Sequence, residues 1–267
     1  MADLELVKAI KEGNGKRYTM QWKNNHPDEE MDLNGADLVE ANLSEARLSG
    51  ANLSGANLNR ANLSHSDLSK ADLSGASLIR ADLSAASLIK VSLESAILIG
   101  AVFSRANLAG ANLFGADLTS VNFGTADLSG ANLGGAKIFG TIFIQAKLCG
   151  ANLFDAQLCG INFANANLAG AKLAQTDFSG ANLFQAILVG VNLSDVDLTG
   201  AELSEADLSG ANLYRASLCG AKMIATNLSG VDLTEADLTG ADLTRAKMFG
   251  VTMLETKKKD ANFSGVA

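Results

Sequence analysis

The stretch Ala51-Asn52-Leu53-Ser54-Gly55 shows the five-residue repeat that decides the fold of this 267-residue chain. The repeat recurs without a break from Met31 to Glu255, which makes forty-five copies. Its first position holds a small or β-branched residue, usually Ala, and its second position is usually Asn or Asp. Its third position always holds Leu, Phe, Ile or Met. Repetition on this scale fixes the fold before any other feature is considered.

A period of five suits neither a regular helix nor a flat strand. On an α-helix, five residues advance by about 140° at ~100° per residue, so the large residues would spiral around the axis. On a flat strand, an odd period would place successive large residues on opposite faces. If the chain instead turns a corner after each repeat, the first and third residues both point inward every time. The pattern therefore predicts a solenoid with a core of Leu and Ala.

The spacing of aromatic residues and glycines indicates four sides to each coil. Phe103, Phe123, Phe143 and Phe163 occupy the third position at intervals of twenty residues, and Gly occupies the fifth position every ten residues from 130 to 250. Twenty residues per coil would stack these Phe side chains and put the Gly residues at opposite corners, where a positive φ carries no Cβ penalty. The predicted coil is a square of four repeats, which gives about eleven coils.

These repeats resemble those of the pentapeptide-repeat family, whose members form a right-handed quadrilateral β-helix. The resemblance covers about five-sixths of the chain and rests on A-(N/D)-L-x-x repeats such as those that begin at Ala36, Ala41 and Ala51. It implies an all-β solenoid of bacterial type. It leaves the function open, because the functions of the family are varied.

Residues 1–30 precede the repeats and hold the only Trp, Trp22, and the only Pro, Pro27. Their apolar pattern predicts a short amphipathic helix over residues 2–12, which Gly13-Asn14-Gly15 would stop. The segment looks like the N-terminal helical caps of many bacterial pentapeptide-repeat proteins. A cap would cover the unpaired strand edges of the first coil. A detachable helix that binds a partner is the alternative.

The β-helix is expected over residues 31–255, as a single domain. Residues 256–267 are expected to form a C-terminal tail or partial cap. Lys258 takes a core position and should break the coil, whereas Asn262-Phe263 returns in phase with the repeats.

Composition and charge narrow the possible partners and the location. The net charge of −8 disfavours a nucleic-acid ligand. No apolar run approaches the ~18 residues of a membrane span, and the N-terminus does not resemble a secretory signal. Cys149, Cys159 and Cys219 take the outward fourth position, on faces or coils too far apart for a disulfide, which needs Cα atoms within ~7 Å. Free thiols lead us to expect a cytoplasmic protein.

The sequence contains no arrangement that suggests catalysis or cofactor binding. His26 and His65 are the only histidines, so neither a catalytic triad nor a zinc site can be drawn. Carboxylates are frequent, but they take outward positions of the repeat, where solubility accounts for them. Glycine-rich phosphate-binding motifs do not occur. We therefore expect a non-enzymatic protein with no catalytic residue, cofactor or metal.

Apolar residues at outward positions suggest one contact surface. Three of them flank one corner of the predicted coil, and three more flank the same corner two coils later, about 9.6 Å away. A contiguous exposed apolar patch suggests a contact site, and neutral drift in a tolerant repeat is the alternative. The six candidate residues are Ile97, Ile99, Val102, Phe139, Ile142 and Ile144.

Negative charge gathers in the late coils. Residues 195–242 contain nine acids and two bases, which gives a net charge of −7 over about 11.5 Å of the predicted axis. This density matches the one charge per ~1.7 Å of duplex DNA, whereas the repeat region as a whole is too sparsely charged. The acids of this band are Asp195, Asp197, Glu202, Glu205, Asp207, Asp232, Glu235, Asp237 and Asp242.

Two functions follow from these features. The first is a binding or scaffolding rod that holds a protein partner of unknown identity, or a second copy of itself, without binding nucleic acid or membrane directly. The alternative is implied by the resemblance, since some pentapeptide-repeat proteins imitate DNA and occupy DNA gyrase or a related topoisomerase. Only the short acidic band suits that role, and the chain lacks the projecting loops that such proteins use. We therefore expect the first function.

Overall fold

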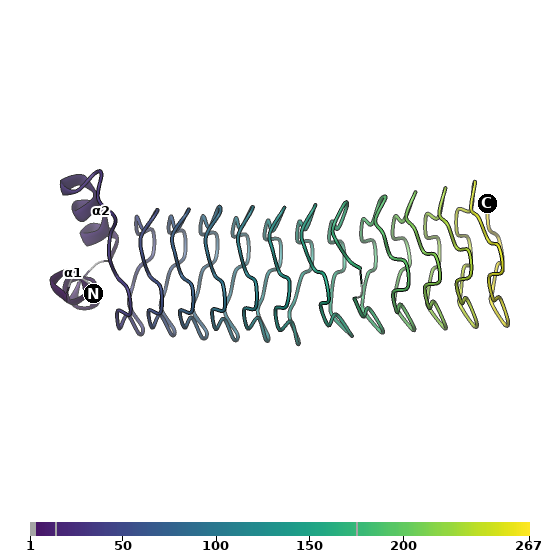
Figure 1. Cartoon of the computed structure of the whole chain (residues 1–267), viewed down its shortest axis with the longest axis horizontal. Coiled ribbons are helices and arrows are strands. Elements are labelled where there is room, and N and C mark those ends of the chain that lie inside the picture. Colours follow the sequence, from purple (N-terminus) through teal and green to yellow (C-terminus); the bar gives the residue numbers. More distant parts are fainter. Residues whose placement is uncertain (1–3, 14, 175) are drawn as a thin grey trace. The chain divides into compact units, whose positions relative to one another are not determined.

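The computed structural model describes residues 4–13, 15–174 and 176–267, which form two compact units. The N-terminal unit is Met1–Thr141 and the C-terminal unit is Ile142–Ala267. Figure 1 shows the same open coils in both units, with two helices preceding the coils of the N-terminal unit.

Parallel β-bridges join residues twenty positions apart within each unit, as in Asn52↔Asp72 and Asn162↔Asn182. Each bridge uses both backbone groups of a second-position residue. The Leu53 amide donates to the Asp72 carbonyl at 2.7 Å, and the Asp72 amide donates to the Ala51 carbonyl at 2.9 Å. Each side of a coil contributes one bridged residue, which is too short for a regular strand. Successive bridges along one side are separated by four repeats, so each unit is a four-sided β-helix, as expected.

Each corner within residues 31–174 and 176–267 is a tight turn with a residue of positive φ at the fifth position of the repeat. The Ala36 amide donates to the Leu33 carbonyl at 3.0 Å, and Gly35 between them has φ of 65°. A positive φ at the third residue of the turn is the property of a type II turn. Non-glycine residues also adopt it, as Ala85 does with φ of 55°.

The second position of the repeat holds these corners closed. The Asn52 side-chain oxygen accepts a hydrogen bond from the Ser54 amide at 3.1 Å, and the Asp237 carboxylate accepts one from the Thr239 amide at 3.0 Å. Asn and Asp suit this position because their short side chains reach the backbone two residues on. The preference for Asn or Asp is therefore structural.

The core consists of the first and third positions, as predicted. Leu53 and Ala51 are fully buried. In the N-terminal unit the rings of Phe103 and Phe123 lie 5.1 Å apart. In the C-terminal unit the rings of Phe143 and Phe163 stack at 4.9 Å with 5° between their planes. The predicted placement of these residues on successive coils is confirmed within each pair, with the Phe103 and Phe123 rings tilted by 31° to each other.

Two helices precede the coils where the sequence predicted one. Helix α1 is Leu4–Glu12 and helix α2 is Gly15–Asn25. The predicted start of the first helix and Asn14 of the predicted stop lie outside the described residues. The second helix was missed because the residues that it buries are Gly15 and Thr19, which give no apolar pattern. Within the described part of the chain, neither helix has the length and apolar character that crossing a membrane requires.

Helix α2 supplies hydrogen bonds that a preceding coil would otherwise provide. The Gly15 amide donates to the Asn42 carbonyl at 3.1 Å, and the Thr19 hydroxyl accepts from the Arg47 amide at 3.1 Å. In later coils the equivalent groups bond to the coil before them, as the Asp67 amide does to the Ala46 carbonyl. The helix thus satisfies two edge groups on the first coil, which would otherwise lack partners.

The coil break expected at Lys258 does not occur. The turns continue through residues 256–265, and Asp237 and Asp242 form bridges with Lys257 and Asn262. Pairing depends on the backbone of the second position, so a charged third-position residue does not interrupt it. Lys258 avoids the cost of burial because its side chain is exposed in the last coil.

Candidate functional site

The N-terminal unit carries a row of apolar fourth-position residues on one side of its coils. We call Val39, Ile79, Ile99 and Phe139 the apolar ladder; Asn59 and Thr119 take the intervening rungs. Backbone bonds fix the stacking: the amides of Arg80 and Ser120 donate to the carbonyls of Ile99 and Phe139 at 2.9 and 2.8 Å. Phe139 is 80% exposed and Ile99 is 37% exposed.

Two residues of the predicted contact surface, Ile99 and Phe139, belong to this ladder. Ile97 lies on the same side at the second position and is 40% exposed, and Val102 follows around the corner and is half-buried. Ile142 and Ile144 belong to the C-terminal unit, the first exposed and the second half-buried. The surface made of all six residues stays a prediction.

A shallow groove of about 380 Å³ runs beside the ladder in the N-terminal unit. Apolar side chains of Val39, Ile79 and Ile99 line it together with two arginines. Arg60 is paired with Glu40 at 3.1 Å, whereas the described residues give Arg80 no ion-pair partner. Val39 and Ile79 were missed in the sequence, although they precede Ile99 by multiples of twenty residues, which is a signal that could have identified them.

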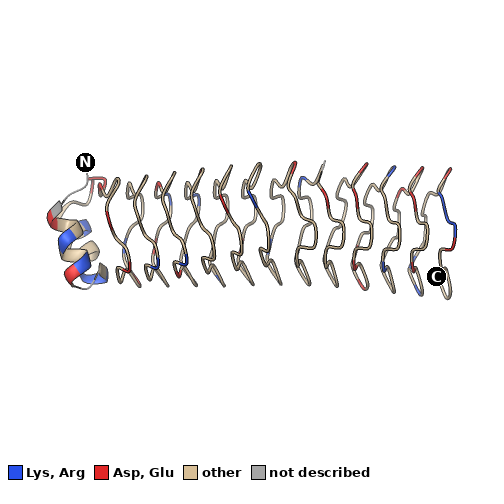
Figure 2. Cartoon of the chain, turned by 90° about the horizontal axis from the view of Figure 1, so that it is seen from below, with Lys and Arg blue, Asp and Glu red and all other residues tan. Residues whose placement is uncertain are grey.

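The nine acids of the predicted band lie in the C-terminal unit, and each has a partner there; Figure 2 colours Asp and Glu red and Lys and Arg blue. Ion pairs join three of them to bases one coil on: Asp195 to Arg215 at 3.0 Å, Glu202 to Lys222 at 3.8 Å, and Asp237 to Lys257 at 3.3 Å. Hydrogen bonds from Gln185 and the Tyr214 hydroxyl reach Glu205 and Glu235. The second-position carboxylates accept the amide two residues on, which includes those of Asp197, Asp207, Asp232 and Asp242.

Hydrogen bonds from neighbouring threonines lower the pKa of several of these acids. The hydroxyl and amide of Thr239 lower the pKa of Asp237 to about 2, and the same arrangement with Thr234 and Thr244 lowers the pKa of Asp232 and Asp242. The direction follows because a hydrogen bond donated to a carboxylate favours its charged form. These acids therefore stabilise their own corners, and the band is less free to meet a partner than its charge count suggested.

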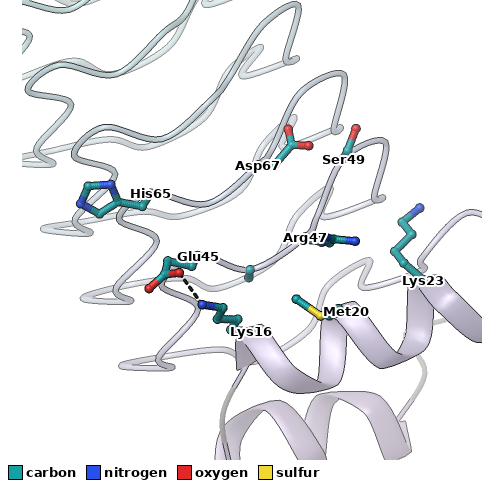
Figure 3. A pocket seen from close by; sticks show the side chains of 9 residues that line it. Lys16, Met20, Lys23, Glu45, Arg47, Ser49, His65 and Asp67 are labelled. Atoms are coloured by element: carbon teal, nitrogen blue, oxygen red, sulfur yellow. Dashed lines mark hydrogen bonds and ion pairs between the residues drawn. The ribbon is translucent and has the colours of Figure 1, made fainter.

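A cleft of about 890 Å³ separates α2 from the coils that follow it in the N-terminal unit. Figure 3 shows Lys16, Met20 and Lys23 reaching into it from the helix, opposite residues of the coils. The lining from the coils consists of Glu45, Ala46, Arg47, Ser49, His65 and Asp67. Sequence reasoning missed this cleft because it depends on α2, which was not predicted.

The remaining candidate chemical groups do not come together. His26 stacks on Trp22 with ring centroids 4.7 Å apart, while His65 lines the cleft. Across residues 4–13, 15–174 and 176–267, no three His, Cys, Asp or Glu side chains are placed to hold a metal ion. Cys149, Cys159 and Cys219 are free thiols, as predicted.

Comparison with known proteins gives a consistent family assignment. The family model for pentapeptide repeats (eight copies) matches in overlapping stretches that together run from residue 29 to residue 265. A search of curated protein sequences found no match.

Among solved structures, the chain is similar to HetL of the cyanobacterium Nostoc sp. strain PCC 7120, a pentapeptide-repeat protein involved in the regulation of heterocyst differentiation. The identity is 30%, covering 92% of this chain and 94% of HetL, with a TM-score of 0.33. Rfr23 of the cyanobacterium Cyanothece 51142 is 32% identical over 42% of this chain and 90% of its own, with a TM-score of 0.29. QnrB1, a plasmid-mediated fluoroquinolone resistance protein, is 20% identical over 72% of this chain and 88% of its own, with a TM-score of 0.43.

Proposed function

This chain belongs to the pentapeptide-repeat family, and on that premise we propose that it is a cytoplasmic, non-enzymatic β-helix of about eleven coils that binds or scaffolds a protein partner. The partner would dock on the side of the N-terminal unit that carries the apolar ladder. Residues 1–30 would serve as the cap of the first coil, and residues 256–267 would cover the far end in part.

The observation that carries this proposal is the ladder itself. Its four apolar residues lie in one row on one side, with Asn59 and Thr119 on the rungs between them, and the exposed Ile97 lies beside the row, whereas isolated surface hydrophobics carry no such meaning. Adjacent rungs are separated by about 4.8 Å, so the ladder spans roughly 24 Å from Val39 to Phe139. That length accommodates a helix of about four turns, whose apolar residues recur at each turn.

The charge beside the ladder indicates the chemistry of the partner. Arg80 lines the groove with no ion-pair partner among the described residues, and Arg60 lies one coil before it. An amphipathic helix with acidic residues flanking its apolar stripe would meet both features. Opposite charges at the rim of an interface favour the encounter and fix the orientation of the partner.

DNA mimicry of a topoisomerase substrate is the weaker alternative. A mimic needs carboxylates that are free to meet the basic surface of the enzyme. Here all nine acids of the band have partners within their own unit, as described above, and three of those partners are cations.

Substitution of the ladder tests the proposal. Ile99→Asp with Phe139→Asp places two charges on the ladder, and Ile187→Asp with Val189→Asp is a matched control on exposed residues of the C-terminal unit. We expect the parent and the control to retain the same bound protein in a pull-down, or the same dimeric mass in light scattering, and the ladder variant to lose it. A ladder variant that keeps both the bound protein and the mass of the parent would contradict the proposal.

A further inference from the structure

The cleft beside α2 joins cationic side chains from two separate parts of the N-terminal unit. Lys16 and Lys23 come from the helix, and Arg47 comes from the first coil. Met20 lies between the two lysines on α2 and adds an apolar surface, as Figure 3 shows. The volume of about 890 Å³ falls within the range of ~300–1,000 Å³ typical of small-molecule sites.

Arg47 differs from five other basic residues that have an acid one coil away. Arg47 and Asp67 form a bridge on successive coils, so an ion pair between their side chains would be the ordinary arrangement. Five stacked pairs do form such ion pairs: Arg60–Glu40, Lys137–Asp117, Arg215–Asp195, Lys222–Glu202 and Lys257–Asp237. The described residues give the Arg47 guanidinium no such partner, and Figure 3 shows it directed toward the Lys23 side of the cleft.

The two lysines of the cleft differ in whether a carboxylate pairs with them. Lys16 is paired with Glu45, so its charge is already compensated. The Lys23 ammonium lies 3.5 Å from the Glu29 carbonyl and 5.6 Å from the centroid of the Trp22 ring, and no carboxylate of the described residues pairs with it. Lys23 and Arg47 are thus two uncompensated positive groups that line one cleft.

From this geometry we propose that the cleft binds a phosphorylated small molecule that also carries hydroxyl groups. Its phosphate would be held by the Arg47 guanidinium, which binds such an anion through two parallel N–H groups, and by the Lys23 ammonium as a point charge. Asp67 keeps one carboxylate oxygen beyond the one that accepts the Ser69 amide at 3.0 Å, and this oxygen would accept a ligand hydroxyl. Met20 would pack against the carbon skeleton of the ligand.

Calorimetric titration of the full chain at low salt tests this proposal with ribose 5-phosphate, inorganic phosphate and ribose as probes. We expect ribose 5-phosphate to bind about tenfold more tightly than inorganic phosphate, because the Asp67 and Met20 contacts are added, and ribose to bind more weakly than either. Arg47→Gln should weaken the binding of ribose 5-phosphate by about tenfold or more, since it removes charge-assisted hydrogen bonds.

Arg105→Gln is the matched control, because Arg105 is an exposed arginine of the same unit that lies outside the cleft and also has no ion-pair partner among the described residues. Lys23→Gln is a second variant for the cleft, and it tests the site independently if Arg47→Gln does not fold. Equal affinity in the parent, Arg47→Gln and Lys23→Gln would overturn the proposal, as would a parent that binds none of the probes at millimolar concentration. Equal affinity of the parent for ribose 5-phosphate and inorganic phosphate would overturn the hydroxyl contact.

Discussion

The carboxylates at the second position of the repeat link the stability of the β-helix to pH. The pKa of Asp237 is about 2 in the folded chain, below its ordinary value of 3.8. A lowered pKa in the folded state means that the stabilisation is complete above about pH 4 and is lost as the pH falls toward 2. We expect the melting temperature to fall across this window.

The control for this pH dependence is Asp237→Asn, which keeps the side-chain oxygen that accepts the Thr239 amide and removes the titration. Circular dichroism melts between pH 7 and pH 2 should show a smaller acid-induced fall in melting temperature for Asp237→Asn than for the parent. If the melting temperatures of the parent and Asp237→Asn followed the same pH profile, the Asp237 carboxylate would not contribute to the acid-induced loss of stability.

A second prediction at the scale of single residues concerns the corners. A Cβ added at Gly75 would meet no atom within 4 Å, so Gly75→Ala tests the cost of positive φ without a clash. We expect a loss of about 1 kcal/mol of unfolding free energy. Ala85→Gly, at φ of 55°, should instead stabilise by roughly 0.5 kcal/mol, because relief of the strain exceeds the entropy lost by Gly. Urea denaturation measures the unfolding free energy of each variant relative to the parent. A change of the same sign in both variants would refute the explanation by positive φ.

The chemistry of individual residues was harder to predict than their positions. Asp197 and Asp237 were identified in the sequence as solvent-facing charges, and in the structure their carboxylates close the turn that follows them. The preference for Asn or Asp at this position contained that information, because the shared property of the two side chains is an oxygen rather than a charge. A count of charges could not distinguish these roles.

The paired Phe side chains give a prediction for the core of the coils. The Phe163 ring lies 4.9 Å from Phe143 and 5.9 Å from Phe178, and all three rings are fully buried. Phe163→Ala should therefore cost ~3–5 kcal/mol, because it removes buried surface and leaves a cavity. Phe154→Ala, where the parent side chain is 47% exposed, should cost about 1 kcal/mol or less. Similar denaturation midpoints for the two variants would mean that ring packing is not what holds these coils together.

The contact of α2 with the first coil gives a prediction for the cap. A Cβ added at Gly15 would lie 2.5 Å from the Asn42 carbonyl oxygen, which is backbone and cannot move aside easily. Gly15→Ala should therefore loosen α2, and trypsin should cut after Lys16, Arg17 and Lys23 faster than in the parent. Gln21→Ala, at an exposed position of the same helix, is the control and should be cut at the parental rate. Unchanged cleavage in Gly15→Ala would refute the role of this contact.

Elements with a periodic core could be predicted, and elements held by single contacts could not. The coils follow from the recurrence of one large and one small inward residue, which any stretch of the repeat displays. Helix α2 is held by the backbone amide of Gly15 and the hydroxyl of Thr19, and neither group leaves a pattern in the sequence. The cleft depends on α2, so it could not be predicted either.

At the scale of the whole molecule, the net charge of −8 does not amount to a DNA-like surface. Ion pairs within the C-terminal unit hold Asp195, Glu202 and Asp237 against cations, so these three carboxylates are not free to meet a partner. We expect no inhibition of DNA gyrase supercoiling when the full chain is added at micromolar concentration. Inhibition that disappears at high salt would favour mimicry and count against the scaffolding function.

The pairing of residues twenty positions apart has a consequence for insertions and deletions. Gain or loss of twenty residues within a unit adds or removes one layer, and every later side chain keeps its face. Gain or loss of a single pentapeptide also keeps every Leu inward, but it moves all later side chains of that unit to the neighbouring face, a quarter-turn away. One short duplication therefore turns the later surface of the unit by a quarter-turn relative to the earlier surface, while the interior stays the same.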